Sequence, residues 1–560
     1  MIKKKIVALK MEEKMCGICG FISNKPMTKD TLIEMNNTLS HRGPDDHGEE
    51  IYQIGINRYV GFAHRRLSIM DLSDKGHQPM HSANEQVSVI FNGEIYNYYE
   101  LRQELSDYTF QSNCDTEVLL AAYLRWGIDF VNKINGMFAI AILDRATSKV
   151  FLIRDRIGKK PLYYYKADND NIIFASELKA IVASAMFSKE VNKDIVGRFL
   201  YRSYIIAPDT IYKNTYKLEQ GSILEISEDA IRQYKYWDVA SKYNELKETI
   251  GLDYECAKNN LKDLLKQAVA RRMEADVPVG AFLSGGYDSS LVCAMAQKLT
   301  DEPIKTFSIG FYDDKYNEAE YAKRVADALG TNHQELYIDE QDMLKIIDSI
   351  PYYYDEPFAD SSQIATMLVS KLAKEKVSVV LSGDGGDELF GGYNIYTILQ
   401  KAQKRKKLGK MMYRLGKIPA MKKTSFWKTR SIVYRIVSDD DNPEANTQQG
   451  VNGYLEAIND ILNNKADNFY YEFESKYCEN RYEITRMLLD MDTWLPEDIL
   501  TKVDRASMKY SLECRCPILD KDVMEFAFKI PQEYKIKVLV NNCVGDFVWR
   551  FMQSLESLYL

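Results

Sequence analysis

After about residue 255 the 560-residue chain repeats a simple order, in which a short apolar run is followed by a stretch with helical spacing. The expected strands cover residues 281–283, 306–309, 335–338 and 377–381. The expected helices cover residues 289–298, 318–329, 343–350 and 363–374. This alternation is typical of a parallel sheet with helices on both faces. Ligands of such sheets bind beyond the carboxyl ends of the strands.

Two glycine-rich turns follow strands of this expected sheet, each directly before a helix. The first reads SGGYDSS over residues 284–290, and the second reads SGDGGDE over residues 382–388. Glycines let backbone N–H groups approach an anion, and a helix N-terminus adds a favourable partial charge. A Walker loop is excluded, because no Gly-Lys-Ser or Gly-Lys-Thr follows the glycines. The alternative for the first turn is a bare glycine turn without a ligand.

The carboxylates of the two turns indicate a cation. Asp288 beside a phosphate is repulsive unless a divalent cation lies between them, so the first turn predicts Mg²⁺. Asp387 of the second turn would share that ion if the two turns lie at neighbouring strand ends. Favourable capping charges at a helix start are the alternative for the second turn. Two such turns in one sheet favour a metal–nucleotide site.

Residues 16–230 carry a different pattern, with many short strands and few helices. Apolar runs rich in β-branched and aromatic residues predict strands over residues 18–22, 87–91, 138–143, 150–154 and 172–175. Helical spacing predicts a helix over residues 115–126 with Asp115 as its N-cap. We expect strands packed in layers with helices outside them. Residues 231–255 would link this domain to the one formed by residues 256–560.

The hexapeptide MCGICG over residues 15–20 has three interpretations. Cys16 and Cys19 could form a redox pair, but no thioredoxin-like βαβ pattern surrounds them. They could be two ordinary buried cysteines. In the third interpretation Cys16 is an N-terminal nucleophile, whose free α-amino group, with a pKa of about 7.7–8.0, serves as base for its own thiol. Residues 1–15 would then be an extension that the mature protein lacks.

Charge and cysteine usage exclude several classes of protein. Lys and Arg total 73 against 81 Asp and Glu, a net charge of -8 that gives no overall attraction to nucleic acid or anionic membrane. No apolar run approaches the roughly 20 residues of a membrane helix. Nine scattered cysteines fit a reducing cytosol, so we expect a cytoplasmic protein. The basic stretch 401–430 is interpreted as a solvated helix face.

Five short stretches in the first half occur in the order found in class II glutamine amidotransferases, which they resemble. They are CGI at 16–18, HRGPD at 41–45, RLSI at 66–69, NGEIYN at 92–97 and DTE at 115–117. The resemblance implies an Ntn-hydrolase-like αββα domain in which the Cys16 thiol attacks the side-chain amide of glutamine. Asn92 and the Gly93 N–H would form the oxyanion hole.

The same resemblance implies a pocket for the amino-acid end of glutamine. Arg66 would pair with the α-carboxylate, a task suited to the guanidinium fork, and Asp115 would take the α-ammonium. The Glu94 region would help to hold the same end, and Leu67 and Ile69 would complete the pocket. We expect His41, His64 and His77 to be structural rather than catalytic.

The first glycine-rich turn resembles the PP-loop of enzymes that split ATP to AMP and pyrophosphate. A glutaminase followed by such a domain is similar to the glutamine-hydrolysing asparagine synthetases, and the resemblance runs from Cys16 to about residue 535. It implies Asp384 in place of a family Glu that acts on the adenylated intermediate. It also implies an ATP site formed by Leu283, Ser284, Gly285, Gly286, Asp288, Ser289, Ile309, Ser382 and Gly383.

The family resemblance implies asparagine synthesis from aspartate, glutamine and ATP, with glutamate, AMP and pyrophosphate as the other products. Ammonia from Cys16 would pass through the interior to a β-aspartyl-AMP intermediate. It also implies a Mg²⁺ requirement and a homodimer. The alternatives are amidation of another carboxylate (a sugar uronate or a secondary metabolite), a ligase that uses free ammonia, and an impaired family member acting as a scaffold. Residues 538–560 favour the last, because they hold no Lys where the family has a basic segment.

Overall fold

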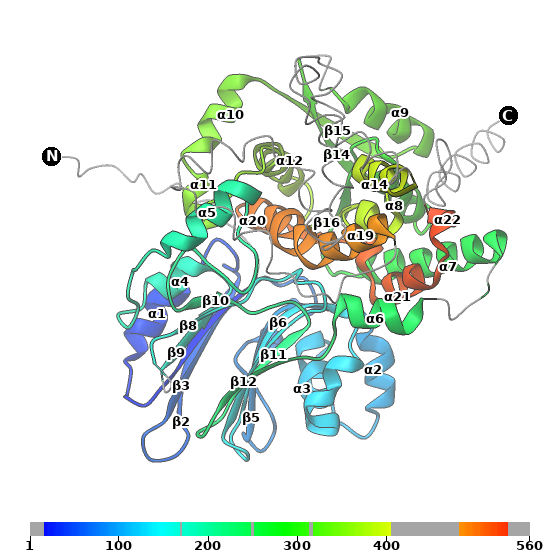
Figure 1. The fold of residues 1–560 in the computed structure, drawn as a ribbon. Helices are drawn as coiled ribbons and strands as arrows, with labels where there is room; N and C mark the ends of the chain where they lie inside the picture. The colour runs from blue at the N-terminus through cyan, green and yellow to red at the C-terminus, as the bar shows by residue number, and fades with distance from the viewer. Residues whose placement is uncertain are drawn as a thin grey trace.

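The computed structural model describes residues 16–168, 171–247, 251, 253–312, 317–404 and 481–535. Figure 1 shows two bodies stacked on each other, the lower built on antiparallel sheets and the upper on a parallel sheet surrounded by helices. Three sequence predictions lie outside the described residues. They concern the extension 1–15, most of the basic stretch 401–430, and the segment 538–560.

The lower body contains two six-stranded antiparallel sheets. The first has the order β10-β8-β9-β1-β3-β2, and its strands are β1 (Gly17–Ser23), β2 (Asp46–Gln53), β3 (Tyr59–Arg66), β8 (Tyr163–Lys166), β9 (Ile172–Ala175) and β10 (Thr215–Lys217). The second has the order β12-β11-β7-β6-β5-β4, and its strands are β4 (Met80–His81), β5 (Val87–Ile95), β6 (Gly136–Asp144), β7 (Lys149–Arg154), β11 (Ser222–Ile226) and β12 (Ile231–Lys235). The five strands predicted for this half are all present.

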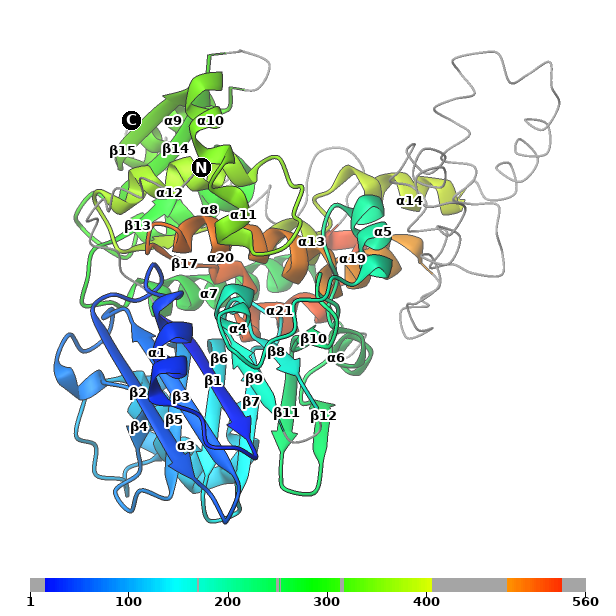
Figure 2. The ribbon, with the colours of Figure 1, turned by 90° about the vertical axis from the view of Figure 1, so that its left-hand side faces the viewer.

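These sheets form the two inner layers of a four-layer sandwich. Apolar side chains meet between them, with Ile18 and Phe62 from the first sheet against Ile90 and Leu152 from the second. Helices cover the outer faces: α1 (Lys29–Asn37) and α4 (Leu178–Val182) lie on the first sheet, and α2 (Tyr98–Glu104) and α3 (Asp115–Trp126) lie on the second. Figure 2 shows α1 against the strands of the first sheet. The expected αββα architecture is confirmed.

The upper body contains one five-stranded parallel sheet with the order β15-β14-β13-β16-β17. Its strands are β13 (Val279–Phe282), β14 (Lys305–Phe311), β15 (Asn332–Ile338), β16 (Val379–Leu381) and β17 (Glu513–Arg515). Helices α7 (Tyr254–Met273), α8 (Tyr287–Gln297), α9 (Ala319–Leu329) and α21 (Lys521–Lys529) pack on one face. Helices α12 (Gln363–Lys374) and α20 (Leu500–Met508) pack on the other. The α/β prediction is therefore confirmed.

Further helices surround these layers. They are α5 (Lys193–Arg202), α6 (Val239–Leu246), α10 (Glu340–Ile347), α11 (Ile350–Tyr354), α13 (Gly386–Phe390), α14 (Asn394–Lys404), α19 (Tyr482–Asp492) and α22 (Gln532–Lys535). The helix expected over residues 343–350 ends earlier, at Ile347 of α10. A second helix, α11, begins at Ile350, with Pro351 in its first turn.

Asp115 and the expected linker differ from the prediction. Cys114 is the N-cap of α3, and Asp115 is the first residue of the helix. The Asp115 carboxylate instead accepts a hydrogen bond from the backbone N–H of Ile95 at 2.9 Å, so it is already engaged on β5. Residues 231–235, placed in the linker, form β12, because they pair with β11 along its whole length.

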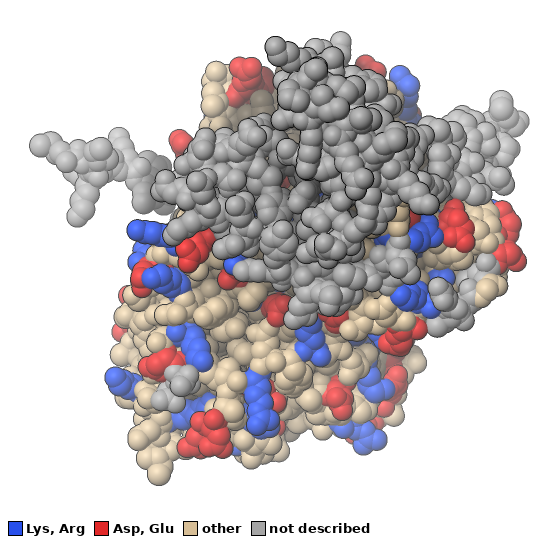
Figure 3. Space-filling model, viewed as in Figure 1, with Lys and Arg blue, Asp and Glu red and all other residues tan. Residues whose placement is uncertain are grey.

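Charged side chains are mixed on the face drawn in Figure 3. Lys and Arg alternate with Asp and Glu across the lower body on this face. Extended positive surfaces attract polyanions, and the described part of this face carries no such surface.

Candidate active sites

Cys16 lies directly before β1, with its thiol against the main chain that follows β3. The N–H of Leu67 donates to the Cys16 Sγ at 3.3 Å, and the Sγ lies 3.7 Å from the Leu67 carbonyl oxygen. Burial raises the pKa of the Cys16 thiol to about 12, and the nearby Glu513 carboxylate adds to the rise. A thiol with that pKa is neutral at physiological pH, so reaction as a nucleophile requires a base beside it.

Ser176 connects the start of β1 to Asn92, a link that the sequence did not reveal. The Ser176 hydroxyl accepts hydrogen bonds from the Ile18 N–H at 3.0 Å and from the Asn92 amide nitrogen at 3.3 Å. One side chain therefore fixes the position of Asn92 relative to the strand that carries Cys16. On β5 the next residue is Gly93, where an added Cβ would lie 2.0 Å from the Met137 carbonyl oxygen. Only glycine fits there, so β5 and β6 stay paired beside Asn92.

Arg66 is held by the loop that follows it. Its guanidinium donates to the carbonyl oxygens of Ser73 at 2.8 Å and of Asp71 and Met70. A Cβ on Gly76 would lie 2.0 Å from the Arg66 Nη2, so the closeness of this loop depends on glycine. Neutral carbonyls orient the guanidinium without neutralising its charge, which leaves the charge available to a carboxylate.

A cluster of acidic side chains lies where the two bodies meet. Glu94 and Asp115 come from the lower body, and Glu513 and Arg515 come from β17 of the upper body. The Arg515 guanidinium lies 2.7 Å from Glu513 and 3.1 Å from Glu94. Burial raises the pKa of Asp115 to about 6, and it raises the pKa of Glu94 although Arg515 opposes the shift. Lys160 lies 4.0 Å from Glu513, so the three carboxylates share two cations, Arg515 and Lys160. One carboxylate is left in excess, which suits an incoming ammonium group.

Leu67 and Ile69 have buried side chains, so the glutamine contacts expected of them would come from their main chain. Their side chains are buried in an apolar cluster with Val379 of β16 and Met508 of α20. The half-buried Cys16 packs against the same cluster. Leu67 contacts the Cys16 thiol through its main chain. The side chains of Leu67 and Ile69 attach this loop to the upper body.

The histidines near this site are engaged elsewhere. His41 lies 3.1 Å from Glu177, His64 lies 3.1 Å from the Phe91 carbonyl oxygen, and His77 lies 2.8 Å from Asp46. Burial lowers the pKa of His64 to about 3. Their partners are structural, in agreement with the sequence prediction.

The two glycine-rich turns meet at one cavity of about 570 Å³ in the upper body. Strands β13 and β16 are parallel neighbours, so both turns leave the same edge of the sheet. An added Cβ on Gly383 would lie 2.6 Å from the Ser289 nitrogen, and one on Gly386 would lie 2.2 Å from an Asp288 carboxylate oxygen. Glycine at these two positions therefore allows the turns to approach each other. Seven of the proposed ATP and metal residues line this cavity: Ser284, Gly286, Asp288, Ser289, Ser382, Gly383 and Asp387.

Three predicted ATP residues do not line the cavity. Leu283 is buried in the core cluster beneath α8, and Ile309 packs on the other face beside α12. Side chains alternate along a strand, which is why Phe282 faces the cavity and Leu283 does not. Gly285 has φ of +81°, and a Cβ there would lie 2.7 Å from the backbone of Ala322. Its contribution is the shape of the turn.

The carboxylates in the cavity fit a divalent cation. Burial, together with the charges of Asp387 and Asp384, raises the pKa of Asp288 to about 7. A Cβ on Gly392 would collide with the Asp387 carboxylate, so that side chain lies in a close backbone cradle. Hard oxygen donors that repel one another are the donor set that Mg²⁺ prefers. Asp288 and Asp387 are therefore the residues that would hold this ion.

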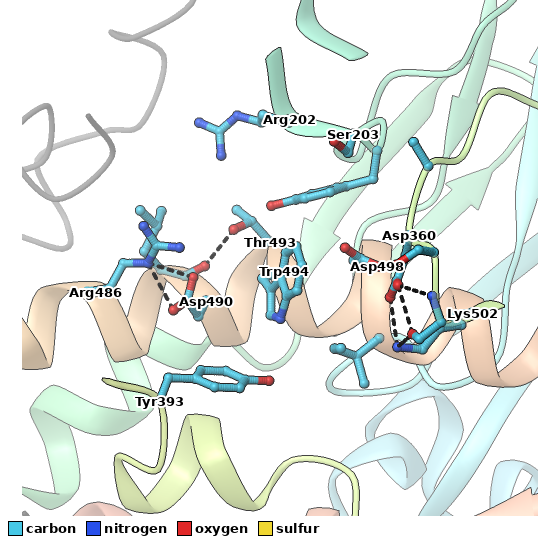
Figure 4. Close-up of a pocket in the computed structure, with 16 residues that line it drawn as sticks. Arg202, Ser203, Asp360, Tyr393, Arg486, Asp490, Thr493, Trp494, Asp498 and Lys502 are labelled. Carbon is cyan, nitrogen blue, oxygen red and sulfur yellow. Dashed lines mark hydrogen bonds and ion pairs between the residues drawn. The ribbon is translucent and has the colours of Figure 1, made fainter. Parts of the chain in front are cut away.

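A second cavity of about 540 Å³ adjoins the first and shares Tyr393, Ile499 and Lys502 with it (Figure 4). At one end Lys502 pairs with Asp360 at 2.7 Å, beside Asp498. At the other end Arg486 pairs with Asp490 at 2.8 Å. No sequence pattern predicted a role for these residues. The two ends offer both cationic and anionic groups.

Asp498 is a carboxyl group of this second cavity whose pKa is raised. Burial and the neighbouring Asp360 carboxylate raise its pKa to about 8. Its Oδ1 is buried without a hydrogen-bond partner among the described residues. A buried polar atom without a partner costs free energy, so this oxygen is positioned for a ligand.

A small cavity of about 20 Å³ lies between the two sites. Met508 lines it and also packs in the cluster beside Cys16, and Val503 lines both it and the nucleotide-type cavity. Buried Lys159 and Lys160 face it as well. A space of this size holds about one water-sized molecule.

Buried ion pairs join the two bodies around these sites. Arg42, which also donates to the Cys16 carbonyl oxygen at 3.0 Å, pairs with Asp504 at 2.9 Å. Lys217 pairs with Glu497 at 2.9 Å, and Arg505 pairs with Glu177 at 2.7 Å. The partners lie hundreds of residues apart in the sequence, so no local pattern predicts them. They keep the Cys16 site and the nucleotide-type cavity in a fixed relation.

Both halves of the chain match known family models. Residues 15–237 match a glutamine amidotransferase domain, and residues 260–541 match an asparagine synthase domain. The chain is therefore a glutamine amidotransferase joined to an ATP-dependent synthetase domain.

Curated relatives define the family. A protein of Methanocaldococcus jannaschii named "putative asparagine synthetase 2 (glutamine-hydrolyzing)" is 39% identical over 524 residues, which cover 88% of this chain and 98% of the relative. Asparagine synthetase 1 of Bacillus subtilis is 34% identical and covers 93% of this chain and 82% of its own length. A protein named amidase chry2 from Gibberella zeae is 26% identical over 93% of this chain and 84% of that protein. The chain belongs to the glutamine-hydrolysing asparagine synthetases. Among the described residues no helix is long and apolar enough to cross a membrane.

Proposed function

We propose that this protein synthesises asparagine from aspartate, glutamine and ATP, with Cys16 releasing ammonia that reacts with an adenylated carboxylate in the upper body. The observation that supports this most is the pairing of two sites in one rigid contact network. Met508 lies in the cluster beside Cys16 and lines the small cavity, and Val503 lines both that cavity and the one formed by the two glycine-rich turns.

The glutaminase half begins with substrate binding. The α-carboxylate of glutamine pairs with the oriented Arg66 guanidinium, and its α-ammonium binds beside Glu94 and Asp115. The Cys16 thiol attacks the side-chain amide carbon, and Asn92 with the Gly93 N–H stabilises the oxygen that gains negative charge. Ammonia leaves, and water then hydrolyses the thioester to give glutamate.

The base for this attack is the α-amino group of Cys16 itself. The thiol pKa of about 12 requires a base, and the described contacts of the thiol are to the main chain of Leu67. An α-amine with a pKa of about 7.7–8.0 is a suitable base near neutral pH. This assignment requires that residues 1–15 be removed from the mature protein.

The synthetase half activates the acceptor. ATP lies with its phosphates against the two turns, and the carboxylate attacks the α-phosphorus to release pyrophosphate. Mg²⁺ held by Asp288 and Asp387 supplies charge neutralisation for the phosphates when it is bound. Asp384, also on the second turn, faces the acyl-adenylate.

The acceptor binds in the second cavity, next to the nucleotide. Its cationic groups, Arg486 and Lys502, fit an α-carboxylate. The Asp360 carboxylate and the unpartnered Oδ1 of Asp498 can accept hydrogen bonds from an α-ammonium. This arrangement favours an amino acid over a simple carboxylic acid. Aspartate, the substrate that the family implies, has both groups.

Ammonia travels through the small cavity between the sites. Its volume of about 20 Å³ admits one small molecule, and the buried Lys159 and Lys160 disfavour a cation in that space. Neutral ammonia therefore passes more readily than ammonium, and only neutral ammonia has the lone pair needed for attack on the acyl-adenylate.

Pyrophosphate exchange into ATP with a panel of carboxylic acids tests this proposal. Exchange with aspartate alone, together with one AMP and one pyrophosphate for each asparagine formed from glutamine, is the expected result. Asp288→Asn should abolish exchange, while the exposed control Asp301→Asn should not. Exchange that occurs with another carboxylic acid and not with aspartate would contradict the proposed function.

Amidation of a different carboxylate is the second candidate. The relative named amidase chry2 spans 93% of this chain, so an enzyme with another name shares the whole architecture. The same panel separates the two functions, since the true acceptor supports exchange.

A further inference from the structure

Two cysteines and one aspartate converge beside the second glycine-rich turn. One donor atom from each of Asp384, Cys514 and Cys516 lies within 4.8 Å of the other two. Among the described residues, these three side chains form the cluster whose donor atoms are close enough to share one metal ion. Cys514 and Asp384 are half-buried, and Cys516 is buried.

The sheet topology produces this convergence. Strand β17 runs parallel to β16, and the Ser382 N–H donates to the Arg515 carbonyl oxygen at 2.9 Å. Residues two apart on an extended strand point the same way, so both thiols face the turn that begins at Ser382. The Ser382 hydroxyl lies 2.7 Å from an Asp384 carboxylate oxygen and 3.3 Å from the Cys516 Sγ.

We propose that Asp384, Cys514 and Cys516 bind one thiophilic divalent cation of the Zn²⁺ class, with water as the fourth ligand. Two sulfurs and one carboxylate suit Zn²⁺, whereas Mg²⁺ prefers oxygen ligands. Zn–S bonds of about 2.3 Å and Zn–O bonds of about 2.0–2.2 Å place tetrahedral donors within about 4 Å of each other. The present separations therefore need only a small contraction.

Both sulfurs must be deprotonated to act as metal ligands. Metal binding would therefore release the protons of the Cys514 and Cys516 thiols, and the affinity should fall as the pH is lowered.

The position of the site predicts its effect. Asp384 lines the nucleotide-type cavity, and the two cysteines line the small cavity between the active sites. A bound cation would occupy the Asp384 carboxylate, which could then not act in the synthetase reaction. Glutamine hydrolysis at Cys16 would be unaffected. This consequence, unlike the binding itself, rests on the proposed function.

Titration of the reduced, full-length protein with Co²⁺ tests binding without any activity assay. Thiolate ligation gives an intense sulfur-to-cobalt charge-transfer absorption, and Zn²⁺ should displace it at a ratio of one ion per chain. Cys514→Ser and Cys516→Ser should each abolish the band, and Asp384→Asn should weaken Co²⁺ at least tenfold. The exposed Cys256→Ser is the matched control and should leave the titration unchanged.

Alkylation of the unsubstituted protein provides a second readout that does not depend on the folding of a variant. Zn²⁺ should slow iodoacetamide labelling of Cys514 at least tenfold and leave Cys256 unaffected. An absorption band that survives both cysteine substitutions, or equal protection of the two cysteines, would overturn the proposal. Asp288→Asn should retain the band, so loss of synthetase activity in that variant does not count against the metal site.

Discussion

Arg515 links the two bodies at the carboxylates of Glu94 and Glu513, and its removal should destabilise the fold. The side chain is 1% exposed and lies 2.7 Å from Glu513 and 3.1 Å from Glu94. It also donates to the carbonyl oxygens of Arg272 at 3.1 Å and Glu274 at 2.7 Å. Arg515→Met leaves the buried Glu94 without its cation and leaves Glu513 with Lys160 alone, at 4.0 Å. Breaking such a buried pair typically costs about 3–5 kcal/mol.

Arg271→Met is the matched control for that change. Arg271 is 22% exposed and pairs with Glu100 and Asp522, which are 52% and 44% exposed. Pairs of this kind contribute about 0–1 kcal/mol. Scanning calorimetry should therefore show a much larger fall in the unfolding midpoint for Arg515→Met than for Arg271→Met.

A second substitution tests the electrostatic reason. Adding Glu94→Gln to Arg515→Met removes one unpaired buried charge and should recover about 1–3 kcal/mol. Glutaminase assays on the folded fraction of Arg515→Met should show a raised KM for glutamine. Equal midpoints for the two arginine variants, or further destabilisation by Glu94→Gln, would refute the reasoning.

Three other predictions concern the two sites. Calorimetric titration of Cys16→Ala with glutamine should show affinity falling about tenfold per pH unit below pH 6, because Asp115, with a pKa of about 6, must be ionised to hold the ammonium; Cys16→Ala with Asp115→Asn should lack this dependence. Gly386→Ala should abolish pyrophosphate exchange but keep glutaminase activity, since its Cβ would lie 2.2 Å from an Asp288 oxygen, whereas Gly251→Ala, with open space, should change neither. Asp384→Asn should lower asparagine formation at least tenfold without changing glutamine hydrolysis; an unchanged rate would remove Asp384 from the reaction.

Local patterns were sufficient to predict the layers of the fold. Strand β9 and helices α3 and α12 match their predicted bounds, because apolar periodicity is strong there. The adjacency of the two glycine-rich turns was also predictable, since parallel strands share one carboxyl edge. The N-cap role of Asp115 was wrong, because a tertiary contact with Ile95 takes its carboxylate.

The parts that local patterns missed depend on distant pairing. Arg515 and Glu94 are separated by more than four hundred residues, and the serine that connects Asn92 to β1 lies on neither strand. The family resemblance places Leu283 and Ile309 at the nucleotide cavity. Because side chains alternate along a strand, both instead point away from it and pack in apolar clusters. Strand β17 completes the sheet from the far end of the chain, where no βα repeat precedes it.

The transfer of ammonia inside the protein is the central claim, and isotope competition tests it most directly. Glutamine labelled with nitrogen-15 in its amide is supplied with aspartate, ATP, Mg²⁺ and an excess of unlabelled ammonium. Our account predicts that the new amide carries the glutamine label almost undiluted, and that Cys16→Ala gives only unlabelled product. Dilution of the label in proportion to the external ammonium would contradict the account.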